Sequence, residues 1–190
     1  AGVPDIDPAQ HRLVINGLVR QPLMFSYEDL LAYPMESRIL FLECSGNSGG
    51  AAGPTAADTS AGGLHGLLSC AEWTGVRLST LLDEAGVLPE ASWVSSTGAD
   101  GASLGRSIPL NKALRDVFIA LYQNGEPIRP EQGYPMRLFV PGWEGNVSVK
   151  WLTQIKLTDM AANFKDETSR YTELLPDGKA LQFTFPMGTK

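Results

Sequence analysis

A short apolar segment that leads to a cysteine and a long run of small residues constrains this sequence most. Residues 39–42 have the composition of a buried strand. The chain then reaches Cys44 and continues through residues 45–63, which are all small or turn-forming. Such residues form no core of their own, and a loop of this length in a compact domain is usually functional or disordered. We therefore expect a strand that holds a thiol beside a loop that a ligand can approach closely.

The composition indicates one loop-rich domain. A chain of 190 residues with 43% apolar content can bury one substantial core, so we expect a single domain. Charged residues make up 19%, below the usual level of about 25%. The net charge of −6 gives no electrostatic support for binding nucleic acid, but it leaves open a basic protein partner such as a small electron carrier. No apolar run approaches the roughly 18 residues that span a bilayer.

The periodicity of the sequence predicts short strands separated by short helices, an α+β (mixed α/β) fold. Strands are predicted at residues 11–16, 37–43, 92–97, 117–122, 135–140 and 151–158, and helices at residues 27–32, 77–86 and 111–115. Ser26 is the predicted N-cap of the first helix. Asn16-Gly17 predicts a tight turn with a return strand that begins at Leu18, and no element is predicted after residue 163. The glycine-rich loops of common nucleotide-binding folds are absent from the sequence.

Cys44, beside Ser45 and Asn47, is the candidate metal ligand. A thiolate suits Mo, Cu, Zn or an iron–sulfur cluster. One cysteine without partner ligands cannot build a zinc or iron–sulfur site, but it can serve a metal that arrives with most of its ligands, as in a pterin-dithiolene cofactor. Two alternatives are a buried free cysteine and a nucleophilic cysteine paired with His65. Cys70 lies in an apolar segment and is predicted to be an inert buried thiol.

A Pro-Gly-x-x-Gly loop at residues 141–145 is a candidate anion site. Such a loop exposes backbone N–H groups between two strands, and Arg137 and Lys150 flank it. This arrangement can hold a phosphate or a pyrophosphate. The alternative is a hairpin whose cations face solvent.

A second basic segment contains Arg106, Ser107 and Lys112. Two cations and a hydroxyl within seven positions also suit a phosphate. A turn that caps a short helix explains the same residues equally well. Trp73, just before the predicted amphipathic helix, is expected to be a packing anchor.

These segments, in this order, resemble the molybdopterin domain of the sulfite oxidase family. The matching residues are 43–47, 71–76, 107–113, 124–125, 133–137 and 140–152. The resemblance implies the mixed α+β sulfite oxidase fold, with residues 1–190 as the molybdopterin-binding catalytic domain. It also implies a longer protein, with an N-terminal segment that contacts the cofactor and a C-terminal immunoglobulin-like dimerisation domain.

The family's cofactor is molybdenum–molybdopterin, and the resemblance implies that one Mo is bound directly by the thiolate of Cys44. It further implies that the pterin and its phosphate are held by polar side chains from several segments. These are Ser45, Asn47, Asp100, Arg106, Ser107, Arg137, Asn146, Ser148 and Lys150.

The sequence departs from the sulfite oxidase pattern at several positions. Ser48, Gly49 and Val147 stand where arginines are expected, Gln132 replaces a histidine, and Leu121 stands at the place of the active-site tyrosine. A small dianion in a pocket needs paired charge. The loss of cations therefore weakens the case for free sulfite as the substrate.

The same segments are most similar to the sulfane dehydrogenase branch of the family. That branch oxidises sulfane sulfur on a carrier-protein cysteine by oxygen-atom transfer and passes electrons to a c-type cytochrome subunit. The similarity implies a periplasmic protein that assembles as a homodimer of heterodimers. Two alternatives remain at this stage: a sulfite dehydrogenase that acts on free sulfite, and a docking module without a cofactor.

Overall fold

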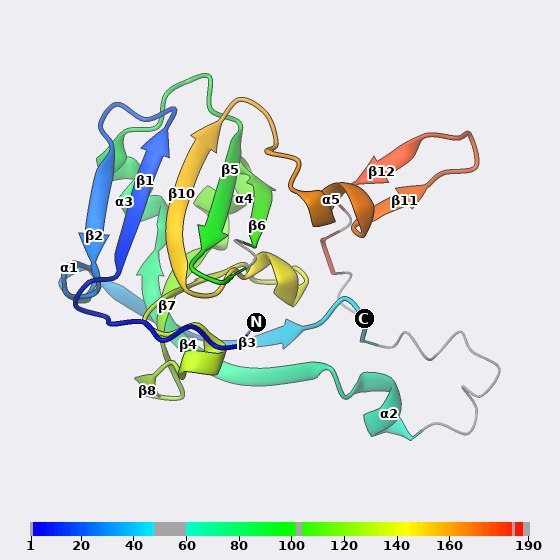
Figure 1. Cartoon of the computed structure of the whole chain (residues 1–190), viewed down its shortest axis with the longest axis horizontal. Coiled ribbons are helices and arrows are strands. Elements are labelled where there is room, and N and C mark those ends of the chain that lie inside the picture. The colour runs from blue at the N-terminus through cyan, green and yellow to red at the C-terminus, as the bar shows by residue number, and fades with distance from the viewer. Residues whose placement is uncertain (1, 48–59, 102–103, 184, 188–190) are drawn as a thin grey trace.

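Two β-sheets form the body of the molecule, and a small hairpin projects from it (Figure 1). The computed structural model describes residues 2–47, 60–101, 104–183 and 185–187. The first sheet runs in the order β2–β1–β10–β5–β6, with β1 and β10 parallel and the other pairs antiparallel. Its strands, in that order, are Leu23–Ser26, Arg12–Gly17, Leu152–Thr158, Trp93–Gly98 and Gly105–Pro109.

The second sheet is antiparallel and carries the strand that leads to Cys44. Its order is β3–β4–β7–β8, and β9 also pairs with β7. The strands are Met35–Glu43, Leu68–Arg77, Phe118–Gln123, Glu126–Pro127 and Arg137–Phe139. In Figure 1 the strands β3 and β4 run beneath the first sheet and across its strand direction.

Short helices connect the strands, and α3 and α4 lie behind the first sheet in the view of Figure 1. The helices are α1 (Tyr27–Leu31), α2 (Ala61–His65), α3 (Leu78–Ala85), α4 (Leu110–Asp116), α5 (Lys165–Ser169) and the 3₁₀ turns η3 (Pro130–Gln132) and η4 (Gly145–Val147). None of the helices in the described ranges is long and apolar enough to cross a bilayer.

The strand β7 lies at the junction of two apolar clusters. Ile119 and Leu121 belong to the main core, which α3 and the first sheet also line. Phe118 and Ala120 point the other way, into a smaller cluster that contains Trp73. Both faces of β7 are therefore buried, and Trp73, 1% exposed, is the packing anchor that the sequence predicted.

Most predicted elements are confirmed. Ser26 caps α1: its Oγ accepts a hydrogen bond from the Asp29 amide, and the Asp29 carboxylate accepts one from the Ser26 amide. Gly86 ends α3 with a φ of 71°, as a C-capping glycine does.

The tight turn predicted at Asn16-Gly17 is wrong, although β1 does pair antiparallel with the next strand, β2. The chain continues past Gly17 beside β10, where the Leu18 amide bonds to the Leu157 carbonyl, and the return strand begins only at Leu23. Gly17 is needed for a different reason. Its φ is 88°, and a Cβ there would lie 2.2 Å from the Leu157 carbonyl oxygen.

The predicted burial of β3 and Cys70 is also wrong. Ile39 and Phe41 are 74% and 65% exposed, because nothing in the described part of the chain covers the outer face of β3 and β4. Cys70 pairs with Phe41 across these strands and shares that face, so it is exposed.

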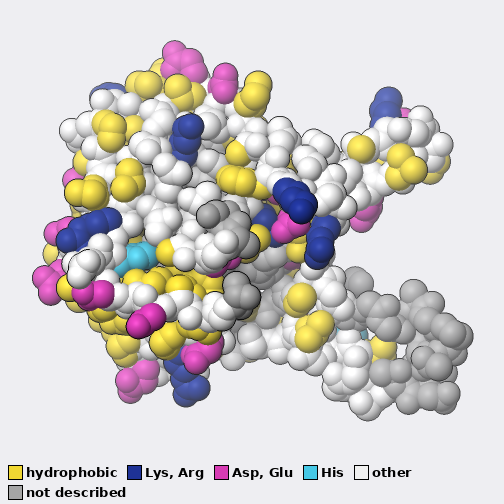
Figure 2. Space-filling view, in the orientation of Figure 1, with side chains coloured by type: hydrophobic (Ala, Val, Ile, Leu, Met, Phe, Trp, Pro, Cys, Tyr) yellow, Lys and Arg dark blue, Asp and Glu magenta, His cyan; other side chains and the backbone are white. Residues whose placement is uncertain are grey.

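The polar C-terminal segment contains elements that the sequence did not predict. After α5, the strands β11 (Thr172–Leu174) and β12 (Ala180–Gln182) form a hairpin that projects from the body. Figure 2 shows apolar side chains on this hairpin, where Leu174 is 80% and Leu181 is 49% exposed.

Candidate functional site

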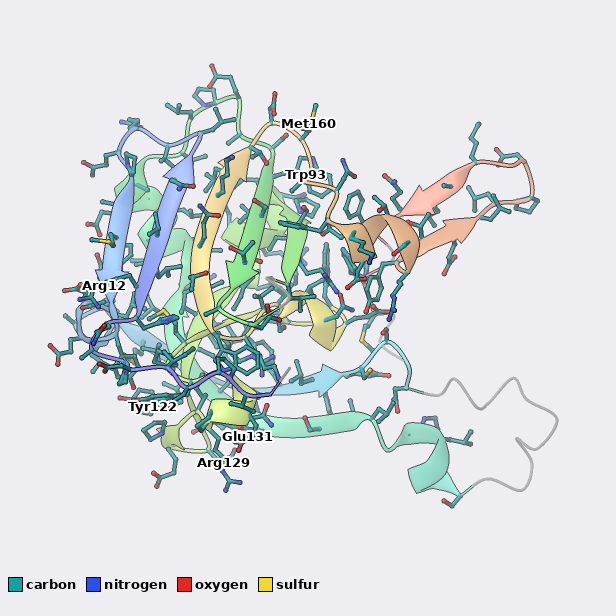
Figure 3. All side chains as sticks on the ribbon, in the orientation of Figure 1. Arg12, Trp93, Tyr122, Arg129, Glu131 and Met160 are labelled. Carbon is teal, nitrogen blue, oxygen red and sulfur yellow. The ribbon has the colours of Figure 1, made fainter. Side chains whose placement is uncertain are left out.

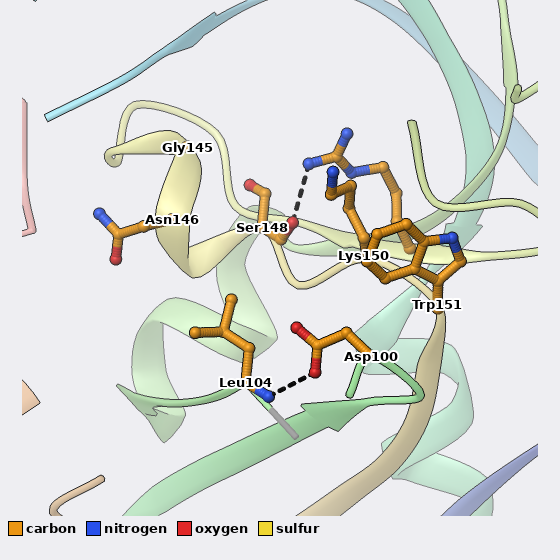
Figure 4. A pocket seen from close by; sticks show the side chains of 8 residues that line it. Asp100, Leu104, Gly145, Asn146, Ser148, Lys150 and Trp151 are labelled. Carbon is orange, nitrogen blue, oxygen red and sulfur yellow. Dashed lines mark hydrogen bonds between the residues drawn. The ribbon is translucent and has the colours of Figure 1, made fainter. Parts of the chain in front are cut away.

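A cavity of about 140 Å³ lies between the end of β5 and the loop that joins β9 to β10 (Figure 4). It brings together five residues that the sequence proposed as cofactor ligands from separate segments. The lining residues are Asp100, Leu104, Arg137, Gly145, Asn146, Ser148, Lys150 and Trp151. Drug-sized ligands fill larger pockets of about 300–1,000 Å³. The volume of this cavity is therefore enough for one end of a larger ligand, such as a phosphate group.

Arg137 is the dominant charge of the cavity. Its Nη2 donates to the Ser148 carbonyl at 2.8 Å and its Nη1 to the Gln132 carbonyl at 3.0 Å. The side chain is 2% exposed, the buried Nε has no hydrogen-bond partner, and no carboxylate in the described ranges forms an ion pair with it. Burial lowers the pKa of Arg137 to about 10. A buried cation without an ion-pair partner beside a cavity favours an anion in that cavity.

The Arg137 side chain also lies over the ring of Trp73, with 5.3 Å between the guanidinium carbon and the ring centroid. Trp73 belongs to β4 and is almost fully buried. The packing anchor of the second sheet therefore fixes the orientation of the main cation of the cavity.

Lys150 is the second cation of the cavity. Its Nζ donates to the Glu131 carbonyl at 2.9 Å and lies over the Trp151 ring. Glu131 is labelled in Figure 3, next to Arg129 near the lower edge of the body. Burial lowers the pKa of Lys150, repulsion from Arg137 lowers it further, and Asp100 opposes both. Arg137 and Lys150 thus place two positive charges at one cavity, and this favours the binding of a phosphate there.

Two residues with positive φ, Gly133 and Trp151, lie next to Lys150. Gly133 has a φ of 110°, and a Cβ there would lie 2.9 Å from the Lys150 Cβ. Trp151 has a φ of 51°, unusual for a bulky residue, and its ring N–H donates to the Pro130 carbonyl at 2.9 Å. Strain of this kind collects at binding sites.

Arg106 stands behind the cavity wall rather than in the lining. Its Nε donates to Asn146 Oδ1 at 2.9 Å, and its Nη2 lies 3.8 Å from Asp166. The side chain is 3% exposed. Arg106 therefore orients Asn146, whose amide also donates to Glu144 at 2.8 Å.

The polar groups of Ser107 and Lys112 are already engaged within the protein. The Ser107 amide and hydroxyl both donate to the buried carboxylate of Glu167, a residue that the sequence did not single out. The Lys112 ammonium donates to Asp116 at 2.9 Å and to the Pro141 carbonyl at 2.6 Å. Neither residue lines the cavity.

Cys44 follows β3 and is exposed. Its amide bonds to the Leu67 carbonyl at 3.0 Å. Asn47 fastens the loop, because its side chain donates to Glu43 at 2.8 Å and accepts from the Leu67 amide at 3.1 Å. Ser48 and Gly49 lie outside the described residues.

The end of β3 and the cavity wall are in contact. A Cβ at Gly145, which lines the cavity, would lie 3.1 Å from the Glu43 carbonyl oxygen. The glycine lets the two segments approach closely, so the Cys44 loop begins beside the cavity. The segment that carries the Cys44 thiol (residues 44–47) therefore starts next to the wall of the cavity.

Three lining residues were missed by the sequence analysis: Leu104, Gly145 and Trp151. Gly145 belonged to the predicted anion loop, which was the available signal. The other two carry no chemistry that marks them in the sequence.

The positions that depart from the sulfite oxidase pattern are mostly buried or uncharged. Val147 and Leu121 are fully buried in the main core. Gln132 contacts Arg137, with its side-chain oxygen 3.4 Å from Nη1. None of these three adds a cation to the cavity.

Comparisons with known proteins identify the family of the chain. Residues 1–165 match the family described as oxidoreductase molybdopterin-binding domain. The chain is 33% identical to a nitrate reductase [NADH] of Ulva prolifera over 171 residues, or 83% of this chain. It is 33% identical to a mitochondrial sulfite oxidase of Drosophila melanogaster over 182 residues, or 92% of this chain.

A solved structure, the sulfane dehydrogenase SoxCD from Paracoccus pantotrophus, superimposes with a TM-score of 0.88. Its sequence is 43% identical, and the match covers 98% of this chain and 48% of that chain. The chain spans 20% of the nitrate reductase and 32% of the sulfite oxidase. The predicted sulfite oxidase-like α+β fold is thereby confirmed.

Proposed function

Since the chain belongs to the oxidoreductase molybdopterin-binding domain family, we propose that it is the cofactor domain of a molybdenum enzyme that oxidises sulfur. The proposed substrate is sulfane sulfur on the cysteine of a carrier protein. The proposed acceptor is a c-type cytochrome subunit in the periplasm, within a homodimer of heterodimers. The buried, unpaired Arg137 in a cavity beside the Cys44 loop carries this proposal.

The residues of the cavity fit the anionic end of molybdopterin. Arg137 and Lys150 supply two cations, and Asn146 and Ser148 offer neutral polar groups. A phosphate would satisfy Arg137 and relieve its repulsion with Lys150. When bound, the molybdenum centre supplies oxygen-atom transfer and two-electron redox chemistry.

Cys44 is proposed to give its thiolate to the metal. The hydrogen bonds of Asn47 hold the loop at the end of β3, so that the thiol is presented from a fixed position. Orientation of this kind is the main contribution of a protein to a cofactor enzyme.

Two observations favour protein-bound sulfane sulfur over free sulfite. The chain is 43% identical to the sulfane dehydrogenase and 33% identical to the sulfite oxidase of Drosophila melanogaster. Val147, where sulfite oxidases have an arginine, is buried in the core and supplies no charge for a dianion. The net charge of −6 suits a basic cytochrome as electron acceptor.

The first test is metal and pterin analysis of the full-length protein made in a host that synthesises molybdopterin. We expect about one molybdenum per chain in the wild type and in Cys70→Ser, the matched control thiol. We expect the Cys44→Ser variant to be folded but to lack turnover. A wild-type protein without molybdenum supports the docking-module alternative, and an active Cys44→Ser variant overturns the role of Cys44.

The second test compares electron donors with the loaded enzyme and cytochrome c as acceptor. A carrier protein with sulfane sulfur on its cysteine should be oxidised much faster than free sulfite. Faster turnover of free sulfite supports the alternative of a sulfite dehydrogenase. The observation behind this alternative is the 33% identity to a sulfite oxidase. Turnover of neither donor refutes the proposed reaction.

A further inference from the structure

We propose that Tyr171 is a positioning residue that connects the Cys44 loop to the wall of the cofactor cavity. Tyr171 follows α5 and lies in the C-terminal segment for which the sequence predicted no structure. It contacts residues of both parts of the site. This inference rests on the proposed function, because it gives Tyr171 a role in presenting the Cys44 thiol.

The first contact of Tyr171 is with Arg106. The guanidinium carbon lies 5.2 Å from the centroid of the Tyr171 ring, a cation–π distance. Arg106 is 3% exposed and donates to Asn146 in the cavity lining. In a buried setting such a contact is worth more than at the surface. The Tyr171 ring therefore holds the Arg106 guanidinium in the orientation in which its Nε donates to Asn146.

The second contact of Tyr171 is with the loop of the candidate metal ligand. Its hydroxyl lies 3.5 Å from the hydroxyl of Ser45, the residue after Cys44. This distance is at the outer limit of a hydrogen bond, so its contribution is at the low end of the range.

The position of Tyr171 is set by a separate anchor. The buried Glu167 accepts hydrogen bonds from the amide and hydroxyl of Ser107 and ties α5 to β6. The Tyr171 amide then bonds to the Asp166 carbonyl at 3.2 Å. On its other side the Tyr171 ring packs against Phe185, with 5.2 Å between centroids. The hydroxyl is thus directed by neighbours that do not touch Cys44.

This arrangement couples the C-terminal segment to the site. A shift of Tyr171 would loosen Ser45 and release one face of Arg106 together. Ser45, beside Cys44, is therefore linked to a residue 126 positions further along the chain.

Thiol alkylation of the full protein, purified without molybdopterin, tests this role without any turnover. Cys44 is measured with iodoacetamide in a Cys70→Ser background, and Cys70 in a Cys44→Ser background as an internal control. Tyr171→Phe removes the hydroxyl and keeps the ring. We expect it to raise the alkylation rate of Cys44 about two- to fivefold. Tyr33→Phe removes a tyrosine hydroxyl at another surface site. It is the matched control and should leave the alkylation rate of Cys44 unchanged.

The pairing of Tyr171 with Ser45 is tested by a double-mutant cycle. Ser45→Ala should raise the Cys44 rate as Tyr171→Phe does, and the double variant should add little more. Unchanged Cys44 rates in Tyr171→Phe, additive effects of the two changes, or an equal rise at Cys70 would each overturn the proposal. Because alkylation needs no metal, a protein that fails to bind molybdenum refutes the proposed function and leaves this measurement interpretable.

Discussion

Replacement of Arg137 by methionine separates a binding role from a structural role. Arg137 is 2% exposed, and burial lowers the pKa of Arg137 to about 10, so burying this charge costs on the order of 3 kcal/mol. Methionine has a similar length without the charge, so Arg137→Met removes this cost. The change also removes two hydrogen bonds, to the carbonyls of Ser148 and Gln132, and leaves these acceptors unsatisfied.

The two effects partly cancel in the cofactor-free protein. Each unsatisfied carbonyl costs about 1–3 kcal/mol, which offsets the relief of the buried charge. We therefore expect the free energy of unfolding to rise by at most about 1 kcal/mol or to fall by at most about 3 kcal/mol. Retention of molybdopterin should fall about 10- to 100-fold, because charge-assisted hydrogen bonds contribute about 1.5–3 kcal/mol.

The assay has two measurements on the same variants. Urea unfolding of the cofactor-free protein gives stability, and the pterin and molybdenum that remain after dialysis give retention. Leu82→Ala, in the core part of α3, is the control and should cost about 2–5 kcal/mol while each folded molecule keeps its cofactor. The reasoning is refuted if Arg137→Met destabilises as strongly as Leu82→Ala and retains the cofactor as the wild type does.

Three further predictions concern neighbouring groups. Lys150→Gln should weaken cofactor retention several-fold and reduce its dependence on salt, both measured by dialysis at two ionic strengths, because one cation of the cavity is lost. Gly133→Ala should cost about 1–3 kcal/mol in urea unfolding, since φ is 110° and the new Cβ would meet the Lys150 side chain. Burial lowers the pKa of His11, so the unfolded chain takes up a proton near pH 6.5 before the folded protein does. Stability should then fall as the pH drops below about 6.5, by at most about 1.4 kcal/mol per pH unit, and His11→Gln should flatten this dependence in unfolding curves at pH 5–8.

Local patterns predicted the elements and part of the site. Arg137 and Lys150 were identifiable because they flank one loop between two strands, so sequence proximity placed them together. Ser107 has the right chemistry for a phosphate, yet its donors serve Glu167, 60 residues further along the chain. Periodicity carries no information about such a distant partner.

The sequence also could not predict which faces of the strands are buried. Residues 39–42 are apolar throughout, which predicts a strand covered on both sides. Whether a second layer exists above β3 depends on the packing of whole sheets, and in the described residues Ile39 and Phe41 are left exposed. The C-terminal segment was missed for a related reason: Glu167 and Tyr171 are ordered by contacts with distant residues and not by local periodicity.

The cavity combines three features that each disfavour the folded chain by itself. Among the described residues Arg137 is buried without an ion-pair partner, Lys150 is repelled by it, and Trp151 adopts a left-handed backbone conformation beside them. Local conflicts of this kind are expected where a site is preorganised for a ligand. One anion resolves the two electrostatic conflicts together, because it pairs with both cations. The strongest physical indication of a bound phosphate is therefore the unfavourable electrostatic energy of Arg137 and Lys150 at this cavity.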